Sequence, residues 1–362
     1  MRGRLRLSGG SGGSPAAALE PGLAQPEPPI RIRSYWNQVW LRFRADRLAV
    51  VSAFFLAFVV LACFAGGPIL ERVLGHGPNT IFPYGASENL TPVGPWSWVP
   101  DTQSGATPGP DTPKTLLILG ADSSLGRDEL LRLLAGGRVS LEIGFLSALI
   151  AILIGLTLGA TAGFYGGWVD SLISRTTEFV MSFPLLLFLI ALGDAISDRF
   201  DFITLAGAFE PGVLSLAVVF GLFTWFYPAR VIRTIVIQLR EQEFVEAARM
   251  IGASDARIIR THLLPHLVAP LLIWGSFVAA TNIVLEAAIS FLNLGIHLPT
   301  ASWGNMLSTN WGTLLAFDPA EVYRVNSAWT MIWPSATVLL TVLALTLVGE
   351  GLRTAFDPKA EG

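Results

Sequence analysis

Lysine is almost missing from this sequence, because Lys114 and Lys359 are the only two. A phosphate-binding P-loop needs a Gly-Lys pair that is followed by Ser or Thr. Lys114 follows Pro113 and Lys359 precedes Ala360, so neither lysine lies in such a motif. The chain therefore has no Walker A site, and if ATP drives this protein, another subunit must hydrolyse it.

Charge and cysteine are also scarce. Charged residues make up 14% of the 362 residues, against about 25% in an average soluble domain. Hydrophobic residues make up 52%, and the mean hydropathy is +0.56. The net charge of -3 argues against nucleic-acid binding. The single cysteine, Cys63, excludes an intrachain disulfide and a cysteine-based metal cluster. These absences indicate a polytopic membrane protein.

The N-terminal segment, residues 1–47, contains no apolar stretch of the kind found in signal peptides. We therefore expect no cleavable signal peptide, and the first span should act as an uncleaved anchor. Residues 8–29 are rich in Gly, Ser, Pro and Ala, which predicts a disordered tail. Arginines and aromatic residues follow in 31–47. We interpret them as a basic flank that sets orientation, and the alternative is a short amphipathic helix on the inner leaflet.

Apolar runs of the length that crosses a bilayer, about 20 residues, follow this segment. We find six: 48–67, 140–164, 176–193, 213–230, 268–289 and 331–350. They predict an all-α integral membrane protein with about six transmembrane helices. If the N-terminus is inside, most of the 24 basic residues face the cytoplasm, as the positive-inside rule requires. Both termini, including the tail 355–362, are then cytoplasmic, and the proline-rich segment 68–139 is an extracytoplasmic loop.

A polar segment, residues 240–266, lies between the fourth and fifth apolar runs. Its first half places apolar residues at i, i+3, i+4 and i+7, on one helix face: Phe244, Ala247, Ala248 and Ile251. Gly252 suits the C-terminus of this helix. Ser254 then suits the N-cap of a second short helix, residues 256–262, which we expect to end before Pro265. The pattern favours a helical hairpin that docks on another protein.

The residues of this hairpin, EAARMIG at 246–252 and HLLP at 262–265, resemble the EAA loop of ABC importer permeases. In that family the loop contacts the ATPase subunit. The resemblance implies that role for Glu246, Ala247, Ala248, Gly252, His262, Leu264 and Pro265. His262 is a departure, since the broad EAA pattern has isoleucine there.

The resemblance extends over about residues 120–358. It is carried by ADSSLGRDELLRLLAGGRVSL at 121–141, YGGWVD at 165–170, SWGNML at 302–307 and GEGLRTAFDP at 349–358. These motifs are similar to the second permease of the pair in the dipeptide, oligopeptide and nickel importer branch. The resemblance implies that residues 140–354 form the five-helix, MetI-like core of type I importers, in the cytoplasmic (inner) membrane.

The same resemblance implies the partners and the mechanism. The partners would be a paralogous permease in a heterodimer, two ABC ATPase subunits and an extracytoplasmic solute-binding protein. ATP and Mg would be bound by the ATPase subunits, and this chain would hold no cofactor. Short peptides would be carried by alternating access, with nickel chelates or other small solutes as alternatives. The proline-rich loop is either a lid or docking surface for the binding protein, or a poorly ordered insertion.

Within the predicted spans, small residues recur every four positions in the second run: Ser147, Ala151, Gly155, Gly159 and Gly163. Such a ridge favours close helix packing, and a pore lining is the alternative. Pro184 should kink the third span. Glu286, inside the fifth span, is a candidate pathway residue, with snorkelling or helix capping as the alternative. Trp303 and Asn305 are candidates for an outer gate.

Two other classes of protein are alternatives to an ABC importer permease. An ion-coupled secondary transporter usually shows internal repeats and ionisable residues at the middle of the membrane, and neither is evident here. An intramembrane enzyme needs a paired catalytic set, and the sequence shows no nucleophile elbow.

Overall fold

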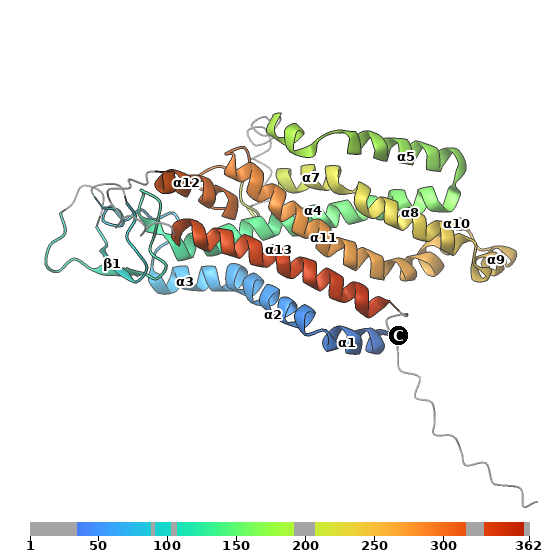
Figure 1. Ribbon diagram of the computed structural model, residues 1–362, viewed down its shortest axis with the longest axis horizontal. Helices are drawn as coiled ribbons and strands as arrows, with labels where there is room; N and C mark the ends of the chain where they lie inside the picture. Colours follow the sequence, from blue (N-terminus) through green and yellow to red (C-terminus); the bar gives the residue numbers. More distant parts are fainter. Residues whose placement is uncertain (1–34, 88–90, 103–106, 192–206, 316–328, 358–362) are drawn as a thin grey trace, which may run out of the picture.

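The computed structural model describes residues 35–87, 91–102, 107–191, 207–315 and 329–357. Within these residues the chain is an elongated helical bundle, with two small sheets at one end and a short helical hairpin at the other (Figure 1). We call these the sheet end and the hairpin end. The longer helices are α1 (Tyr35–Ala45), α2 (Arg47–Leu61), α4 (Glu129–Tyr165), α5 (Gly167–Ser182), α7 (Val213–Thr224), α8 (Phe226–Arg240), α11 (Leu264–Phe291), α12 (Trp303–Leu315) and α13 (Trp329–Phe356). The shorter elements are α3 (Gly67–Leu74), α9 (Glu243–Met250), α10 (Asp255–Arg257), β1 (Ser97–Pro100), β2 (Lys114–Leu117), β3 (Ala121–Asp122) and β4 (Arg127–Asp128).

Four helical stretches in the described residues are long and apolar enough to cross a membrane. They are Arg47–Leu74, Glu129–Tyr165, Asp255–Phe291 and Trp329–Phe356. Two bent pairs bring the number to six if each pair is one span: Gly167–Ser182 with Leu185–Ala191, and Val213–Thr224 with Phe226–Arg240. The predicted mostly helical membrane fold is therefore confirmed.

The bends have identifiable positions. The first pair bends by 67°, at the break that contains Pro184, where we expected a kink. The second pair bends by 42° at Trp225, which we did not predict. Pro228 lies in the first turn of the helix that follows, where its missing N–H leaves no hydrogen bond unmade.

Helices extend further than the apolar runs, so the predicted boundaries at 68 and 139 need correction. The segment between them begins in α3, which lasts to Leu74, and ends in α4, which starts at Glu129. Helix α4 starts there because Asp128 is its N-cap. Its Oδ1 accepts hydrogen bonds from the backbone N–H groups of Leu130 (2.9 Å) and Leu131 (3.2 Å). Hydropathy alone misses this polar first part of the helix.

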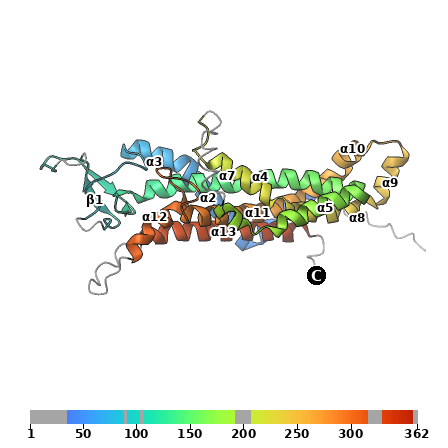
Figure 2. The same ribbon diagram turned by 90° about the horizontal axis from the view of Figure 1, so that it is seen from above.

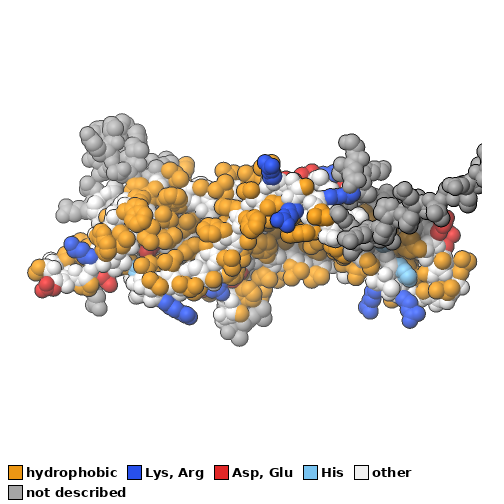
Figure 3. All heavy atoms as spheres, turned by 90° about the horizontal axis from the view of Figure 1, so that it is seen from below, with side chains coloured by type: hydrophobic (Ala, Val, Ile, Leu, Met, Phe, Trp, Pro, Cys, Tyr) orange, Lys and Arg blue, Asp and Glu red, His pale blue; other side chains and the backbone are white. Residues whose placement is uncertain are grey.

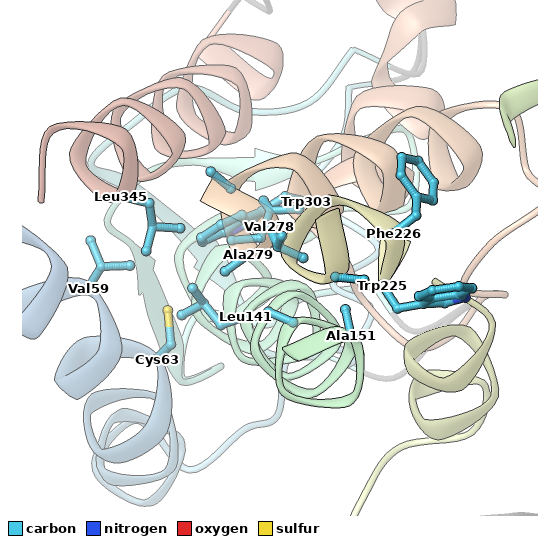
Figure 4. Close-up of a cluster of buried hydrophobic side chains, with 14 residues drawn as sticks. Val59, Cys63, Leu141, Ala151, Trp225, Phe226, Val278, Ala279, Trp303 and Leu345 are labelled. Carbon is cyan, nitrogen blue, oxygen red and sulfur yellow. The ribbon is translucent and has the colours of Figure 1, made fainter. Parts of the chain in front are cut away.

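Helix α4 is the centre of the bundle, and α7, α8 and α11 pack along it (Figures 1 and 2). The largest buried cluster joins α2, α4, α8, α11, α12 and α13 and includes Leu141, Ala151 and Trp303 (Figure 4). The face of the bundle seen in Figure 3 is largely hydrophobic, as expected for helices that face lipid.

The sheet end is folded around its own small core of Phe82, Val99, Leu117 and Ala121. Strands β1 and β2 pair antiparallel, with Ser97 opposite Leu117, and β3 pairs with β4. These strands were not predicted, because prolines break the alternating pattern by which strands are recognised. The proline-rich loop is thus an ordered cap in its described residues, and not an unstructured insertion there.

Candidate coupling hairpin and buried polar clusters

The hairpin turn is closed by a Schellman motif at the end of α9. Gly252 has φ +81°, and its N–H donates to Arg249 O (2.9 Å), while Ala253 N–H donates to Ala248 O (3.0 Å). A residue with a side chain adopts this left-handed conformation at a cost, so glycine is the natural residue here. The predicted helix end at Gly252 agrees with this geometry.

One face of α9 is held by the rest of the chain. Val245 (0% exposed) and Ala248 (4% exposed) pack in a buried cluster with Ile258, Leu263 and Leu267. Ala248 therefore lies on the inner face of the hairpin, and its side chain is not offered to another protein. The predicted stripe fails at Ala248 because Val245, three residues earlier, shares its buried face.

The opposite side of the hairpin exposes large apolar side chains. Met250 is 82% exposed and Ile251 is 86% exposed, and Phe244 is 38% exposed. Glu246 and Ala247 are exposed on the same short helix. Ile251 lies past the helix end, with φ -85° and ψ 6°, so it does not continue the predicted i+7 position. The exposed set is therefore the tip of the hairpin rather than a helical stripe.

The second half of the hairpin runs directly into α11, and the prediction of a helix that ends before Pro265 is wrong. Helix α10 begins after Ser254, whose side chain makes no capping hydrogen bond, and a π-helical segment, Ile258–Leu263, joins it to α11. Pro265 then lies in the first turn of α11, where proline is tolerated.

The other HLLP residues lie along this junction. His262 and Leu264 are half-buried and Pro265 is exposed. The Phe244 ring lies 6.4 Å from the ring of His262 and 5.8 Å from that of His266, measured between centroids. These contacts connect the two arms of the hairpin. Arg249 also lies over the ring of Phe164, 5.5 Å from its centroid, and so ties the hairpin to the end of α4.

The small-residue ridge of α4 faces α7 and α8. A Cβ added at Gly155, Gly159 or Gly163 would lie 2.5–2.9 Å from atoms of α8 or the Trp225 carbonyl. Ser147 and Ala151 are both 0% exposed. The ridge thus lets the two backbones approach closely, which is the packing role that small residues have in membrane helices.

The three candidate pathway or gate residues are all buried where α4, α11 and α12 meet. Glu286 is 0% exposed, and its carboxylate accepts hydrogen bonds from Ser140 Oγ and Ser290 Oγ, both at 2.7 Å. The backbone N–H of Trp303 donates to the same Ser140 Oγ (3.2 Å). Asn305 Nδ2 donates to the carbonyls of Ile296 (3.2 Å) and Thr300 (2.7 Å). Glu286 therefore faces other helices and not lipid. In this conformation Glu286 and Trp303 connect α11 and α12 to α4, and Asn305 holds the loop between α11 and α12.

The sheet end contains a buried charge network that the sequence analysis missed. The Asp122 carboxylate lies 2.7 Å from Arg127 Nη2 and 2.6 Å from Arg132 Nε, and accepts a hydrogen bond from Asn310 Nδ2 (2.9 Å). Arg132 is 0% exposed, and its Nη1 donates to Asn79 Oδ1 (2.7 Å). The only signal in the sequence was the density of acids and arginines in 121–132, which by itself also fits a solvated loop.

A histidine at the edge of this network is linked to α4. His76 Nε2 lies 3.0 Å from Asp128 Oδ2, and its side chain is 7% exposed. This hydrogen bond raises the pKa of the His76 imidazole above its ordinary value, because it favours the charged form.

A cavity of about 650 Å³ lies between α4, α5 and α8. Its lining residues are Gly159, Ala162, Ile173, Ser174, Thr177, Glu178, Met181, Ser182, Ala229, Arg230, Arg233 and Thr234. Arg233 forms a two-pronged ion pair with Asp170, in which Nη2 donates to Oδ2 at 2.6 Å and Nε donates to Oδ1. The sequence analysis did not predict this cavity, because its residues come from three separate spans.

Two family models match parts of this chain. Residues 155–362 match the family described as binding-protein-dependent transport system inner membrane component. Residues 34–92 match the N-terminal transmembrane domain of oligopeptide transport permease C. The chain is 32% identical over 335 residues to the glutathione transport system permease protein GsiD of Shigella dysenteriae serotype 1, covering 92% of this chain and 94% of the relative. The GsiD protein of Escherichia coli O157:H7 has the same identity and coverage. Among solved structures, an inward-facing MetNI methionine ABC transporter aligns with a TM-score of 0.43 and 18% identity, covering 62% of this chain and 96% of that chain.

The fold and the matches define a membrane permease subunit. This chain belongs to the family of binding-protein-dependent transport system inner membrane components, the permeases of ABC importers. Members of this family work with ATP-binding and solute-binding partners. Family membership also decides against the ion-coupled transporter and the intramembrane enzyme.

Proposed function

We propose that this chain is one of two paralogous permeases in an importer for short peptides, and that the hairpin at Glu243–Arg257 receives the force of ATP hydrolysis. The peptide cargo is supported by the match to oligopeptide permease C and by the likeness to the glutathione permeases. Nickel chelates and other small solutes are the alternative cargo. The second permease, two ATPase subunits that bind ATP and Mg, and a solute-binding protein complete the assembly.

The observation that carries the coupling role is the exposed tip of a rigid hairpin. Met250 and Ile251 are more than four-fifths exposed, next to a turn that is fixed by the Schellman motif and by the buried Val245 and Ala248. Two large apolar side chains that are exposed to water do not stabilise the chain. They fit the hydrophobic core of an interface with a partner protein. A short, stiff hairpin that continues into α11 passes a push directly to a membrane span.

The orientation follows from the same assignment. The ATPase subunits are cytoplasmic, so the hairpin end faces the cytoplasm and the sheet end faces the binding protein. The positive-inside rule agrees with this placement, because with the hairpin end inside most of the 24 basic residues are cytoplasmic, among them Arg240, Arg249, Arg257 and Arg260. Alternating access would then be a rocking of the bundles of the two permeases around the cargo.

The double substitution Met250→Ser and Ile251→Ser tests this role. Burying one such side chain is worth about 1.5–3 kcal/mol, so losing both should weaken ATPase binding by at least about tenfold. Copurification of the ATPase subunits and ATP-dependent uptake in vesicles measure the two effects. The control is Leu125→Ser, an apolar residue that is 43% exposed at the sheet end, which should keep the ATPase bound. Normal association in the double variant would disprove the coupling role of the hairpin tip.

A further inference from the structure

The cavity between α4, α5 and α8 contains two arginines in different electrostatic states. Arg233 is neutralised by the two-pronged pair with Asp170. Arg230, one turn earlier on α8, is exposed in the cavity, and its contact given by the structure is Nη1 to the Met181 sulfur at 3.5 Å. A thioether sulfur is a weak acceptor and carries no charge. Among the described residues, Arg230 is thus a cation without a carboxylate partner.

The acid on the cavity wall, Glu178, contacts another arginine. Glu178 Oε2 lies 3.4 Å from Arg175 Nη1, one turn earlier on α5 and outside the cavity lining. The remaining polar wall consists of hydroxyls, from Ser174, Thr177, Ser182 and Thr234. These groups accept or donate hydrogen bonds but do not neutralise a cation. Within the described part of the chain, the cavity therefore contains one arginine, Arg230, that has no carboxylate contact, beside the Arg233–Asp170 pair and the Arg175–Glu178 pair.

The surroundings of Arg230 differ from those of a lipid-facing surface. Helix α2 exposes only apolar residues along most of its length, among them Val51, Phe54 and Phe58. Helix α5 instead exposes Arg175 and Glu178, whose side chains are 83% and 66% accessible, beside the cavity. Charges inside a span are costly in lipid and mark water-filled pathways or protein contacts. The α5–α8 side is therefore the side of the bundle that faces water or another subunit.

The shape of the cavity suits a small flexible solute. Its volume of about 650 Å³ lies within the range of small-molecule sites, roughly 300–1,000 Å³. Gly159 and Ala162 of α4 are part of the lining, and Gly159 lets the α4 backbone approach α8 closely. The two bends of the helices, at Pro184 and Trp225, lie just beyond Ser182 and before Arg230 on the cavity walls. A movement at either bend would change the opening of the cavity.

We propose that this cavity is a cargo subsite of the permease, in which Arg230 binds the free C-terminal carboxylate of a short peptide. This inference rests on the proposed peptide importer and adds the group of the cargo that the membrane subunit recognises. A planar guanidinium matches a carboxylate with two parallel hydrogen bonds, and an ammonium does not. Because Arg233 is already paired with Asp170, it does not compete with Arg230 for the peptide, so that a single carboxylate is bound.

The test uses the complete nucleotide-free complex with Cys63→Ala and Ser182→Cys in this chain, so that the one thiol of this chain lies on the α5 wall of the cavity. The rate of labelling by N-ethylmaleimide, a neutral reagent, is measured with increasing trialanine or trialanine C-terminal amide. Trialanine should slow the labelling, and the amide, which lacks the carboxylate, should need about tenfold higher concentration or more. Equal protection by both peptides, or no protection by either, would overturn the proposal. Such a result is also the one expected if Arg230 pairs with an acid of another subunit, and the proposal would then be wrong as well.

Substitutions at Arg230 sharpen the result. Arg230→Gln should remove the advantage of trialanine over its amide, and Arg230→Lys should keep part of it. Arg72→Gln, an exposed arginine on α3 that does not line the cavity, is the matched control and should leave the difference unchanged. ATP-driven uptake by the wild-type complex is measured in parallel. Absent uptake of all peptides would disprove the proposed importer function, whereas uptake with equal losses for both peptides in Arg230→Gln would disprove only the carboxylate subsite.

Discussion

The sheet end and the hairpin end of the bundle differ in the exposure of their charged and apolar side chains. At the sheet end, Asp122, Arg127 and Arg132 are at most 3% exposed and contact one another. At the hairpin end, Glu246 and Arg249 are exposed, and so are the apolar side chains of the tip. The charged side chains of the sheet end pair within the chain, whereas the side chains that we propose to dock on the ATPase are exposed at the hairpin end. Burial thus distinguishes the sheet end from the part of the chain that we propose to dock on the ATPase.

The largest effect should come from breaking the sheet-end network. Arg132→Ala leaves the Asp122 carboxylate buried with less compensation, and removing one partner of a buried pair costs about 3–5 kcal/mol. Thermal unfolding of the chain in lipid nanodiscs measures this loss. Arg353→Ala is the control, since Arg353 is 69% exposed and pairs with Glu350, which is 57% exposed, within α13. That change should cost less than about 1 kcal/mol. Equal midpoints for the two variants would contradict the internal role of the network.

A smaller and local effect is expected at the hairpin turn. A Cβ at Gly252 would meet nothing within 4 Å, so Gly252→Val acts only through the backbone at φ +81°. The cost is about 1–2 kcal/mol. Hydrogen exchange at the amides of Gly252 and Ala253 should then become about 5- to 30-fold faster, while the sheet end keeps its protection. Gly252→Asn should change exchange less, because asparagine tolerates the left-handed region better. Unchanged exchange in the valine variant would show that the turn is not held by this motif.

The smallest effect concerns His76 and pH. Its pKa is raised above 6.5 in the folded chain by the hydrogen bond with Asp128. A raised pKa means that the stabilisation is fully present below the unfolded pKa and disappears as the pH rises through the folded pKa. The difference in unfolding midpoint between the wild type and His76→Gln should therefore shrink as the pH rises from about 5 to 8. A difference that grows over this range would contradict the ion pair.

The sequence predicted the features that repeat along a helix and missed those that need three dimensions. Apolar runs located the spans, Pro184 located a bend, and Gly252 located a turn, because each depends on local chemistry. Span ends were misplaced because caps such as Asp128 extend helices beyond the apolar residues. Ala248 was assigned to the docking face because a short helix has apolar residues on both sides, and only packing against Ile258 decides which side is inside.

The buried polar sites were the least predictable. Asp122 and Asn310 are 188 residues apart in sequence and meet only in the folded chain. The α4–α5–α8 cavity likewise combines residues of three spans, and Arg230 looks from sequence like one more positive charge at the end of a span. The position of Glu286 in an apolar run marks it as unusual. Its serine partners on α4 and α11 could not be predicted from the sequence.

The most direct measurement of the central claim is site-specific photo-crosslinking in the assembled transporter. A benzophenone amino acid is placed at Ile251, on the hairpin tip, and in a second variant at Trp98, which is 64% exposed at the sheet end. The account predicts that Ile251 crosslinks to an ATPase subunit and that Trp98 does not. An ATPase crosslink at Trp98, or a hairpin tip that crosslinks only to lipid, would contradict it.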